Sequence, residues 1–370
     1  MIFEKIKLLS KSLIYILIIN LKIIFCKIKS IKVIIFCYPN YKLKNISKFY
    51  IEDLFNTKNN FKIIYLTTDK KNLNSKEIFI YNSLIKYLIK VDLFISNYVC
   101  DYFPLSKLKS YIHHDIYDTP LSNLSEEKNL KNRLNKYDHI LIPSSNSKVI
   151  FQRLKLKKNI EYFEIGYHKL NFLKNKRRKL KKKTFNTIII APTNFNSFPK
   201  LSMYKKINII IDLLLVKTNY NVIFRPHPSN LYTNIVDRIE KKFSKYKNFN
   251  IDKSKNYFNT YSNSFLMITD LSGTAYTYSF LTLNPVLFFS ISEKILKKNN
   301  YNNLNYFKDR KKIGYIVNHE NKLIKLIQKS KLMNSDRLNF INNNIKKMNI
   351  NNSKKLFELY LKNNILKKND

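Results

Sequence analysis

The sequence predicts an α/β protein built from two successive doubly wound parallel sheets. The chain has 370 residues, more than one ordinary hydrophobic core accommodates, which indicates two domains. Its hydrophobic content of 45% is normal for a globular protein. Apolar runs alternate with amphipathic helical patterns over most of the length, and this alternation is typical of βαβ units with parallel strands.

The first half supplies the strands of one sheet. The run KVIIFC, from Lys32 to Cys37, is continuously apolar and predicts a buried strand. Further strands are expected at 62–66, 92–96, 110–113, 139–143 and 161–165. Helices are expected between them at 47–55, 78–88, 129–137 and 147–154.

The strand–helix pattern starts again after a strongly basic stretch. The segment from Lys174 to Lys183 (KNKRRKLKKK) has almost no apolar residue, so we expect an interdomain linker at 173–184; a charge run that touches phosphate head groups is the alternative. Beyond it, strands are expected at 187–191, 221–224, 265–269 and 285–289, and helices at 203–216, 232–243, 274–282, 320–327 and 353–366. The expected organisation is an N-terminal helix at 1–30, a first domain at 31–172, the linker, a second domain at 185–330 and C-terminal helices at 331–370.

The N-terminal segment is apolar and flanked by lysines. No small-residue cleavage site follows the run from Leu13 to Cys26, which argues against a signal peptide. The run is shorter than the roughly 20 residues that a spanning helix needs, and Lys22 interrupts it. Two expectations stay open: an amphipathic helix on the inner face of the cell membrane, and a helix packed on the first domain.

The chain is extremely basic, with 68 Lys and Arg against 25 Asp and Glu and a formal net charge of +43. This charge predicts an anionic partner: phosphorylated substrates, an acidic membrane face or nucleic acid. An AT-rich coding composition accounts for part of it, because Lys, Asn and Ile are abundant throughout while the chain has 3 Gly and no Trp. The lysines are spread along the chain without a nucleic-acid-binding motif, so no specific nucleic acid is expected.

The three cysteines, Cys26, Cys37 and Cys100, have neither metal-ligand nor disulfide-framework spacing. They are expected to be unreactive thiols in a reducing cytoplasm.

Arg225-Pro226-His227-Pro228 directly follows a predicted strand. Ligands of doubly wound sheets bind outside the carboxyl ends of the strands, so this is a favoured place for a site. The two prolines stiffen the backbone around Arg225 and His227. An Arg fork matches phosphate oxygens and His adds a donor, which predicts a phosphate-binding site.

A second candidate phosphate site is the turn Asp270-Leu271-Ser272-Gly273-Thr274. It follows a predicted strand and opens a predicted helix, whose free N–H groups and partial positive charge suit an anion. Gly273 lets the backbone approach an anion closely, and Ser272 and Thr274 add hydroxyl donors. An ordinary helix cap, with Asp270 or Ser272 at its start, fits the same residues.

The segment from Tyr111 to Leu121 is the chemically rich part of the first half. It contains two histidines and two carboxylates within six residues, namely His113, His114, Asp115 and Asp118. A histidine near neutral pKa can take a proton from an acceptor hydroxyl while a carboxylate orients it. The spacing matches no zinc motif, and no metal is expected.

Together these segments resemble the CDP-glycerol glycerophosphotransferase family of teichoic-acid and capsule enzymes. That family shows an apolar strand running into Arg-Pro-His-Pro, as at 225–228, and a strand ending in Asp before a Ser-rich turn, as at 270–274. The stretches Ala191-Pro192-Thr193 and 284–289 (NPVLFF) also look like its second-domain strands. The family's Trp-His-Gly runs at once into Thr-Pro-Leu. Here Thr119-Pro120-Leu121 follows His113 and His114 by several residues, so which of them is the base stays open.

The resemblance implies a glycosyltransferase-B architecture, with two Rossmann-like domains facing a cleft. It also implies transfer of glycerol-phosphate, or a related polyol-phosphate, from a CDP-activated donor to a hydroxyl of a glycan or lipid-linked glycan, with no cofactor. His113 or His114 is then the base, and Asp115 or Asp118 orients it. His227 acts on the diphosphate, and the donor is held by the set Thr193, Arg225, His227, Asp270, Ser272, Gly273 and Thr274.

A glycosyltransferase of the same architecture is the alternative function. It would use a nucleotide-sugar donor in capsule or lipopolysaccharide synthesis, and the same groups would stabilise the nucleotide that leaves. In either case the expected location is the cytoplasm, with the inner face of the cell membrane as a possible partner.

Overall fold

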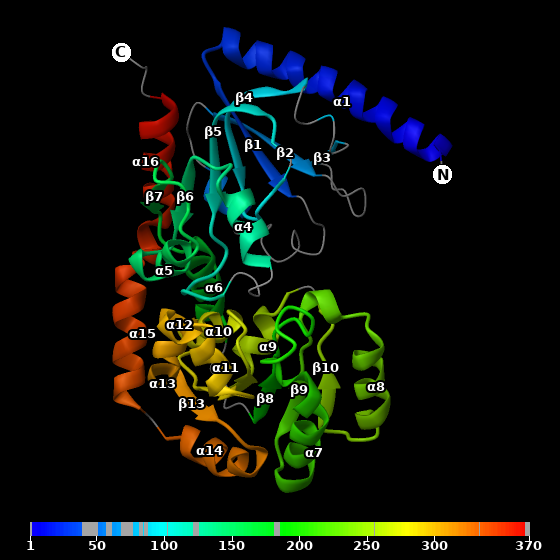
Figure 1. The fold of residues 1–370 in the computed structure, drawn as a ribbon, viewed down its shortest axis with the longest axis vertical. Coiled ribbons are helices and arrows are strands. Elements are labelled where there is room, and N and C mark those ends of the chain that lie inside the picture. Colours follow the sequence, from blue (N-terminus) through cyan, green and yellow to red (C-terminus); the bar gives the residue numbers. More distant parts are fainter. Residues whose placement is uncertain are drawn as a thin grey trace.

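The computed structural model describes residues 2–38, 51–56, 61–67, 77–80, 84, 88–101, 103–120, 126–180, 186–254, 256–332 and 334–366. Within these ranges the chain forms two parallel sheets, one in each half, which stand one above the other in Figure 1. The expectation of two successive doubly wound sheets is therefore confirmed. Leu121 and residues 181–184 of the expected linker lie outside the described residues.

The first sheet has seven parallel strands in the order β3-β2-β1-β4-β5-β6-β7. Val33, Ile34, Ile35 and Phe36 of the central strand β1 are all fully buried, because helices and loops cover both faces of a parallel sheet. The strand bounds are β1 Lys32–Tyr38, β2 Phe61–Thr67, β3 Glu77–Phe79, β4 Lys90–Ser96, β5 Leu105–Ile112, β6 His139–Ile142 and β7 Glu161–Glu164. The helices of this half are α1 Ile2–Ile28, α4 Glu127–Leu134, η2 Ser145–Ser147, α5 Val149–Arg153 and α6 His168–Arg178.

The expected helix at 78–88 is wrong at its start. Ile78 and Phe79 belong to β3, where they pair with Leu66 and Thr67 of β2. Pairing at the sheet edge overrides the local helical pattern. Of the helix expected at 47–55, residues 51–55 are helical, and 47–50 lie outside the described residues.

The second sheet has six parallel strands in the order β10-β9-β8-β11-β12-β13. Its strands are β8 Thr187–Ile190, β9 Asn221–Phe224, β10 Phe249–Ile251, β11 Leu266–Thr269, β12 Val286–Phe289 and β13 Gly314–Val317. The edge strands β10 and β13 were not expected from the sequence. A Cβ on Gly314 would lie 1.7 Å from the Val286 carbonyl oxygen, so only glycine permits the close pairing of β12 and β13.

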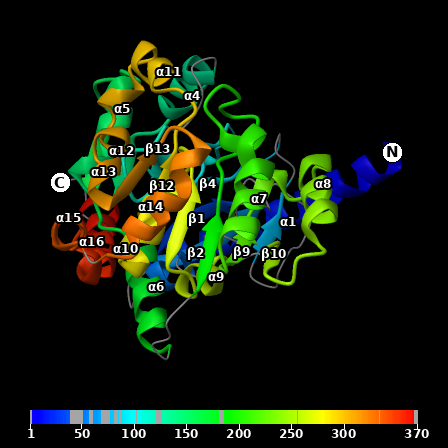
Figure 2. The ribbon, with the colours of Figure 1, turned by 90° about the horizontal axis from the view of Figure 1, so that it is seen from below.

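Helices cover both faces of the second sheet, as seen from below in Figure 2. Helix α10 (Thr274–Thr282) follows β11, and all residues from Ala275 to Thr282 are buried. The other helices are η3 Met203–Lys206, α7 Ile207–Lys217, η4 Pro228–Asn230, α8 Asn234–Phe243, α9 Phe258–Ser262, α11 Glu293–Lys298, η5 Tyr301–Asn303, α12 Asn305–Lys308, α13 Arg310–Ile313, η6 Glu320–Lys322 and α14 Leu323–Ser330.

The last part of the chain returns to the first domain. Helices α15 (Ser335–Lys347) and α16 (Ser353–Leu361), with η7 (Ile350–Asn352) between them, run along one side of both domains in Figure 1, and η8 (Lys362–Leu366) ends the described chain. The Tyr360 hydroxyl lies 2.6 Å from Ser110 Oγ and 2.9 Å from His139 Nδ1. Helix α16 thus packs on β5 and β6, whose bonded residues lie 250 and 221 positions earlier in the sequence.

Part of the expected linker is helical. Helix α6 continues to Arg178, since Leu170 and Leu173 bury their side chains in the core. Arg177 Nη1 donates to the carbonyl oxygens of Leu281 and Thr282, at 3.1 and 3.3 Å, at the end of α10. These contacts stabilise the helix in spite of its polar sequence.

The loop after β5 joins the two domains. The Tyr117 ring stacks on Tyr276 with centroids 4.1 Å apart, and its hydroxyl donates to Asp309. Asp118 accepts a hydrogen bond from the backbone N–H of Ile150 in the first domain, at 2.7 Å, and from that of Asn305 in the second, at 2.8 Å. One buried carboxylate therefore fastens backbone of both domains.

Helix α1 packs on the first domain, which is one of the two expectations for the N-terminus, and leaves an apolar face exposed. Ile16, Ile19, Ile23 and Cys26 are buried against the first sheet, while the opposite face exposes apolar side chains to solvent. The exposed apolar residues are Phe3, Ile6, Leu13, Ile14, Tyr15, Leu17, Ile18, Leu21, Ile24, Phe25 and Ile28. The whole helix, from Phe3 to Ile28, is longer than its apolar run and is long and apolar enough to cross a membrane by length and composition alone.

We predict that Asp118→Ala destabilises the protein by about 2 kcal/mol, because it leaves two buried backbone N–H groups without an acceptor. The measurement is the thermal unfolding midpoint. Asp212→Ala is the matched control, since Asp212 is an exposed carboxylate on α7. Equal midpoints for the two variants would contradict the bridging role.

The same substitution is expected to have a pH-dependent effect. Burial raises the pKa of Asp118 from 3.8 to about 6, against the opposing hydrogen bonds from Asn305 and Ile150. The stabilising contribution of the protonated group is complete below about pH 3.8 and is lost as the pH rises to about 6. The midpoint deficit of Asp118→Ala should therefore be larger at about pH 4.5 than at about pH 7, and a deficit of constant size would refute this assignment.

Candidate active site

A cavity lies between the two domains. It has a volume of about 280 Å³ and is lined from both sides. Its walls include residues that follow strands β5, β8, β9 and β11, as expected for ligand sites at the carboxyl ends of parallel strands. The predicted site residues that line it are His114, Asp115, Thr193, Arg225, His227, Ser272, Gly273 and Thr274.

His114 reaches the cavity from the first domain. Its ring stacks on Tyr98 with centroids 5.4 Å apart, and its Nδ1 lies 3.0 Å from the Tyr111 hydroxyl. The His114 carbonyl oxygen accepts a hydrogen bond from the Tyr167 hydroxyl at 2.8 Å. The ring and the backbone of His114 are therefore both fixed, and its Nδ1 is hydrogen-bonded to Tyr111.

Asp115 lies beside the start of α10 in the second domain. Its carboxylate accepts a short hydrogen bond from the Thr119 hydroxyl. A Cβ on Gly273 would lie 2.9 Å from Asp115 Oδ1, so glycine permits this approach of the loop to the start of α10. Burial alone would raise the pKa of Asp115, but His114, His113 and the Thr119 hydrogen bond hold that pKa below its ordinary value.

His113 and Asp118 do not line the cavity. His113 is 2% exposed, neither ring nitrogen has a hydrogen-bond partner among the described residues, and burial lowers its pKa to about 3. It borders a separate space of about 20 Å³, room for one water molecule, behind the strand ends. Both carboxylate oxygens of Asp118 accept hydrogen bonds from backbone N–H groups, one from Ile150 in the first domain and one from Asn305 in the second.

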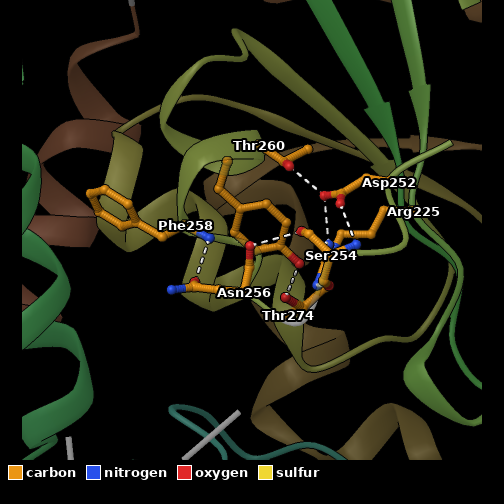
Figure 3. A network of polar contacts seen from close by, with 8 residues as sticks. Arg225, Asp252, Ser254, Asn256, Phe258, Thr260 and Thr274 are labelled. Carbon is orange, nitrogen blue, oxygen red and sulfur yellow. Dashed lines mark hydrogen bonds and ion pairs between the residues drawn. The ribbon is translucent and has the colours of Figure 1, made fainter. Parts of the chain in front are cut away.

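Arg225 lines the cavity, but most of its guanidinium is already bound. Nη1 donates to Asp252 Oδ2 at 2.5 Å and to Ser254 Oγ at 3.2 Å, and Nη2 donates to the Ser254 carbonyl at 3.0 Å (Figure 3). Burial would raise the pKa of Asp252, but the charge of Arg225 and hydrogen bonds from Ser254 and Thr260 keep it below the ordinary value. Arg225 thus fixes the loop that follows β10.

His227 has a defined hydrogen-bonding state. Its Nδ1 accepts a hydrogen bond from the Ser229 backbone N–H at 3.2 Å. Burial lowers the pKa of His227 to about 4, although Asp115 opposes that shift. The ring is therefore neutral at physiological pH, and its proton lies on Nε2, which is available as a donor.

Asp270 shapes the cavity without lining it. Oδ1 accepts from the backbone N–H groups of Thr193, at 2.8 Å, and Leu271, at 2.7 Å, and Oδ2 accepts from that of Met203, at 2.9 Å. Burial raises the pKa of Asp270, against these three hydrogen bonds. The carboxylate fixes the loops after β8 and β11, which carry Thr193 and the 272–274 turn.

The turn at 272–274 opens α10 toward the cavity. Gly273 is the residue before the helix, and no side chain caps the free N–H groups there. The Thr274 hydroxyl lies 2.5 Å from the Tyr261 hydroxyl, which fixes its direction (Figure 3). An uncapped helix N-terminus on a cavity wall can bind an anion.

Several residues of the cavity wall were not predicted. Tyr98, Tyr167, Lys169, Tyr257 and Tyr261 contribute to it. Tyr257 and Tyr261 stack with centroids 4.5 Å apart, and Lys169 Nζ lies 5.1 Å from the centroid of the Tyr257 ring. Tyr98 follows β4, so the strand-end rule could have found it. The others lie in or next to short helical segments and do not follow a strand. In a chain with 26 tyrosines, the presence of a tyrosine does not by itself indicate a site.

Among the described residues, no group of three or more His, Cys, Asp and Glu side chains is arranged to hold a metal ion. The three cysteines are buried and carry free thiols.

The family model of CDP-glycerol:poly(glycerophosphate) glycerophosphotransferases matches residues 22–361. No curated protein matches.

Solved structures share the fold at low identity. The wall teichoic acid polymerase TagF is similar with a TM-score of 0.58 and 18% identity over 90% of this chain and 88% of that chain. A TagF variant soaked with CDPG has a TM-score of 0.55 and 17% identity over 90% and 88%. The UDP-GlcNAc 2-epimerase of Neisseria meningitidis, bound to UDP-GlcNAc, has a TM-score of 0.54 and 11% identity over 89% and 99%.

These likenesses confirm a fold of the glycosyltransferase-B type, with two parallel-sheet domains. The family match extends over most of the chain and through both domains that line the cavity. The chain therefore belongs to the CDP-glycerol:poly(glycerophosphate) glycerophosphotransferase family and is a transferase.

Proposed function

We propose that the protein transfers glycerol-phosphate from CDP-glycerol to a hydroxyl of a glycan or lipid-linked glycan precursor of the cell surface. The observation that carries this proposal is the shared cavity. One wall carries a histidine and a carboxylate of the first domain, His114 and Asp115, and the opposite wall carries a stiffened histidine and an uncapped helix N-terminus.

The second domain holds the donor. The diphosphate lies against the backbone N–H groups of the 272–274 turn, where the positive end of α10 stabilises negative charge. Neutral His227 donates from Nε2 to an oxygen of the diphosphate. The sequence predicts that Arg225 holds the donor. Its proposed role is to position the 252–254 loop and to add positive charge at the cavity wall.

The first domain activates the acceptor through His114. In this role His114 Nδ1–H donates to the Tyr111 hydroxyl oxygen, which leaves Nε2 unprotonated and able to take the proton of the acceptor hydroxyl. The negative charge of Asp115 stabilises the imidazolium that results. This choice between the two histidines is supported by burial, since His113 has no surface on the cavity.

The reaction is an in-line displacement at the donor phosphorus that carries glycerol. The acceptor oxygen forms the new P–O bond as its proton moves to His114. The bond to the bridging oxygen breaks, and CMP leaves with the electron pair. Catalysis consists of positioning and electrostatic stabilisation, as in phosphoryl transfer generally.

Helix α1 supports a second proposal, peripheral attachment to the cytoplasmic face of the membrane. Its apolar face is exposed over the length of the helix, and lysines flank that face at 5, 7, 11, 22, 27 and 29. Such a helix lies in the membrane interface, where lysines pair with anionic lipid head groups. It lies along the outer edge of the first domain, away from the second domain in Figure 1.

We predict that His114→Asn lowers kcat by about 10²-fold or more, the usual contribution of a general base, while CDP-glycerol still raises the thermal midpoint. His319→Asn is the matched control, because His319 is exposed and distant in sequence from every cavity residue. If the His114→Asn variant retained normal turnover, His114 could not be the general base.

The donor itself is tested by ligand-induced thermal shifts with CDP-glycerol and with CDP-, CMP- and UDP-linked sugars. We expect CDP-glycerol to stabilise the wild-type protein most, and His227→Ala to reduce that shift because a diphosphate donor group is lost. A larger shift with a nucleotide-sugar would favour the glycosyltransferase alternative.

The membrane proposal predicts that Leu17→Gln combined with Leu21→Gln weakens binding to anionic vesicles by at least about tenfold, because two apolar side chains no longer enter the lipid. These leucines are 62% and 57% exposed. Leu332→Gln with Leu359→Gln removes two comparably exposed leucines elsewhere. Co-sedimentation with vesicles is the measurement, and equal loss in both double variants would argue against α1 as the anchor.

A further inference from the structure

The ring of His114 contacts two tyrosines of the first domain. Tyr98 stacks on it with centroids 5.4 Å apart, and the Tyr111 hydroxyl lies 3.0 Å from its Nδ1. Tyr98 follows β4 and Tyr111 belongs to β5, and these two strands pair in the first sheet. The direction of the His114 ring is therefore set by two adjacent segments, and a residue that fixes both segments also fixes the ring.

The segment 96–100, which carries Tyr98, folds around the hydroxyl of Tyr137, a residue between α4 and β6. The Tyr137 oxygen accepts the backbone N–H of Cys100 at 2.9 Å, and it lies 2.8 Å from Ser96 Oγ and 3.2 Å from the Tyr98 carbonyl oxygen. Ser96 Oγ lies 2.7 Å from the same carbonyl oxygen. One hydroxyl thus contacts the start, the middle and the end of the segment.

Two arrangements of hydrogens satisfy the contact between the two hydroxyls. Either Tyr137 donates to Ser96 and Ser96 donates to the Tyr98 carbonyl, or Ser96 donates to Tyr137 and Tyr137 donates to that carbonyl. In both arrangements the Tyr98 carbonyl oxygen receives a hydrogen, and the N–H of Cys100 has the Tyr137 oxygen as its acceptor. Loss of this hydroxyl would leave the buried N–H of Cys100 without a partner.

The ring of Tyr137 supports the other contact of His114. It packs against the Tyr111 ring with centroids 5.8 Å apart and edge-on against Phe103 at 5.0 Å. Tyr137 is buried and does not line the cavity, so any effect on the reaction must act through other side chains. A phenylalanine would fill the same core space, and a buried hydroxyl is costly unless it is bonded. The hydroxyl therefore serves the segment that carries Tyr98.

We propose that Tyr137 is a positioning residue for the transfer reaction, which fixes the His114 ring through Tyr98 and Tyr111. The inference rests on the proposed function, since it takes His114 as the base. A base must meet the acceptor hydroxyl within hydrogen-bond reach, so a ring that is free to turn spends less time in the reactive orientation. The Tyr98 ring also stabilises the imidazolium that forms when His114 takes the proton.

Tyr137→Phe tests this proposal, because it keeps the ring and removes the hydroxyl. The assay is CMP release from CDP-glycerol with poly(glycerol phosphate) as the acceptor. We expect kcat to fall about tenfold, while the KM for CDP-glycerol changes by less than about twofold. Tyr360→Phe is the matched control. Tyr360 is similarly buried against the same domain, and its hydroxyl contacts Ser110 and His139, so its thermal midpoint should fall as well while kcat stays unchanged.

Histidine NMR of the full-length protein supplies a readout that core packing alone would not move. The Tyr98 ring shields the ring protons of His114, whose signal is the one missing from His114→Asn. Tyr137→Phe should move this signal downfield, and Tyr98→Leu should move it in the same direction. Tyr360→Phe should instead move the signal of His139 and leave that of His114 in place.

An equal loss of kcat in Tyr137→Phe and Tyr360→Phe would overturn the positioning role, as would an unmoved His114 signal in Tyr137→Phe. Should Tyr137→Phe not fold, Tyr98→Leu replaces it, because Tyr98 is only half-buried, and full activity in that variant would contradict the proposal. A His114 signal that moves in Tyr137→Phe, in a protein that does not turn over CDP-glycerol, would uphold the support of the ring and refute the proposed donor.

Discussion

The cleft depends on the loop that joins β5 to α4, because this loop is fastened to both domains at once. Tyr117 stacks on Tyr276 of α10, and Asp118 accepts backbone N–H groups from each side. His114 and Asp115 precede these anchors by a few residues. Their distance from the 272–274 turn is therefore fixed by the domain contact itself. A loop anchored in one domain alone would let the two walls of the cavity drift apart.

Carboxylates show how buried charge is used in this protein. Asp118 and Asp270 each accept hydrogen bonds from backbone N–H groups of segments that are distant in sequence, and neither lines the cavity. A short acidic side chain is well suited to this, since it offers two acceptors to donors that no strand or helix satisfies. Asp115, by contrast, accepts a hydrogen bond from the Thr119 hydroxyl, and its carboxylate lines the cavity.

The sequence predicted most of the fold, because long Val- and Ile-rich runs such as 32–37 form central parallel strands that are buried on both faces. It did not predict β10 and β13, edge strands of three and four residues whose pairing partners decide their conformation. The strand-end rule located the site. This rule did not show which of the two histidines, His113 or His114, and which of the two carboxylates, Asp115 or Asp118, lines the cavity, because all four follow the same strand. His113 packs against Phe151, and Asp118 is bonded to Ile150 and Asn305, contacts that only the tertiary structure brings about.

The return of α16 to the first domain has a consequence for how the chain is made. Phe357 packs edge-on against Phe55 at 5.1 Å, and Tyr360 bonds to Ser110, a residue synthesised 250 positions earlier. While the ribosome is still translating the second domain, this apolar patch of the first sheet has no cover. The first domain therefore completes its packing only after α16 has been synthesised.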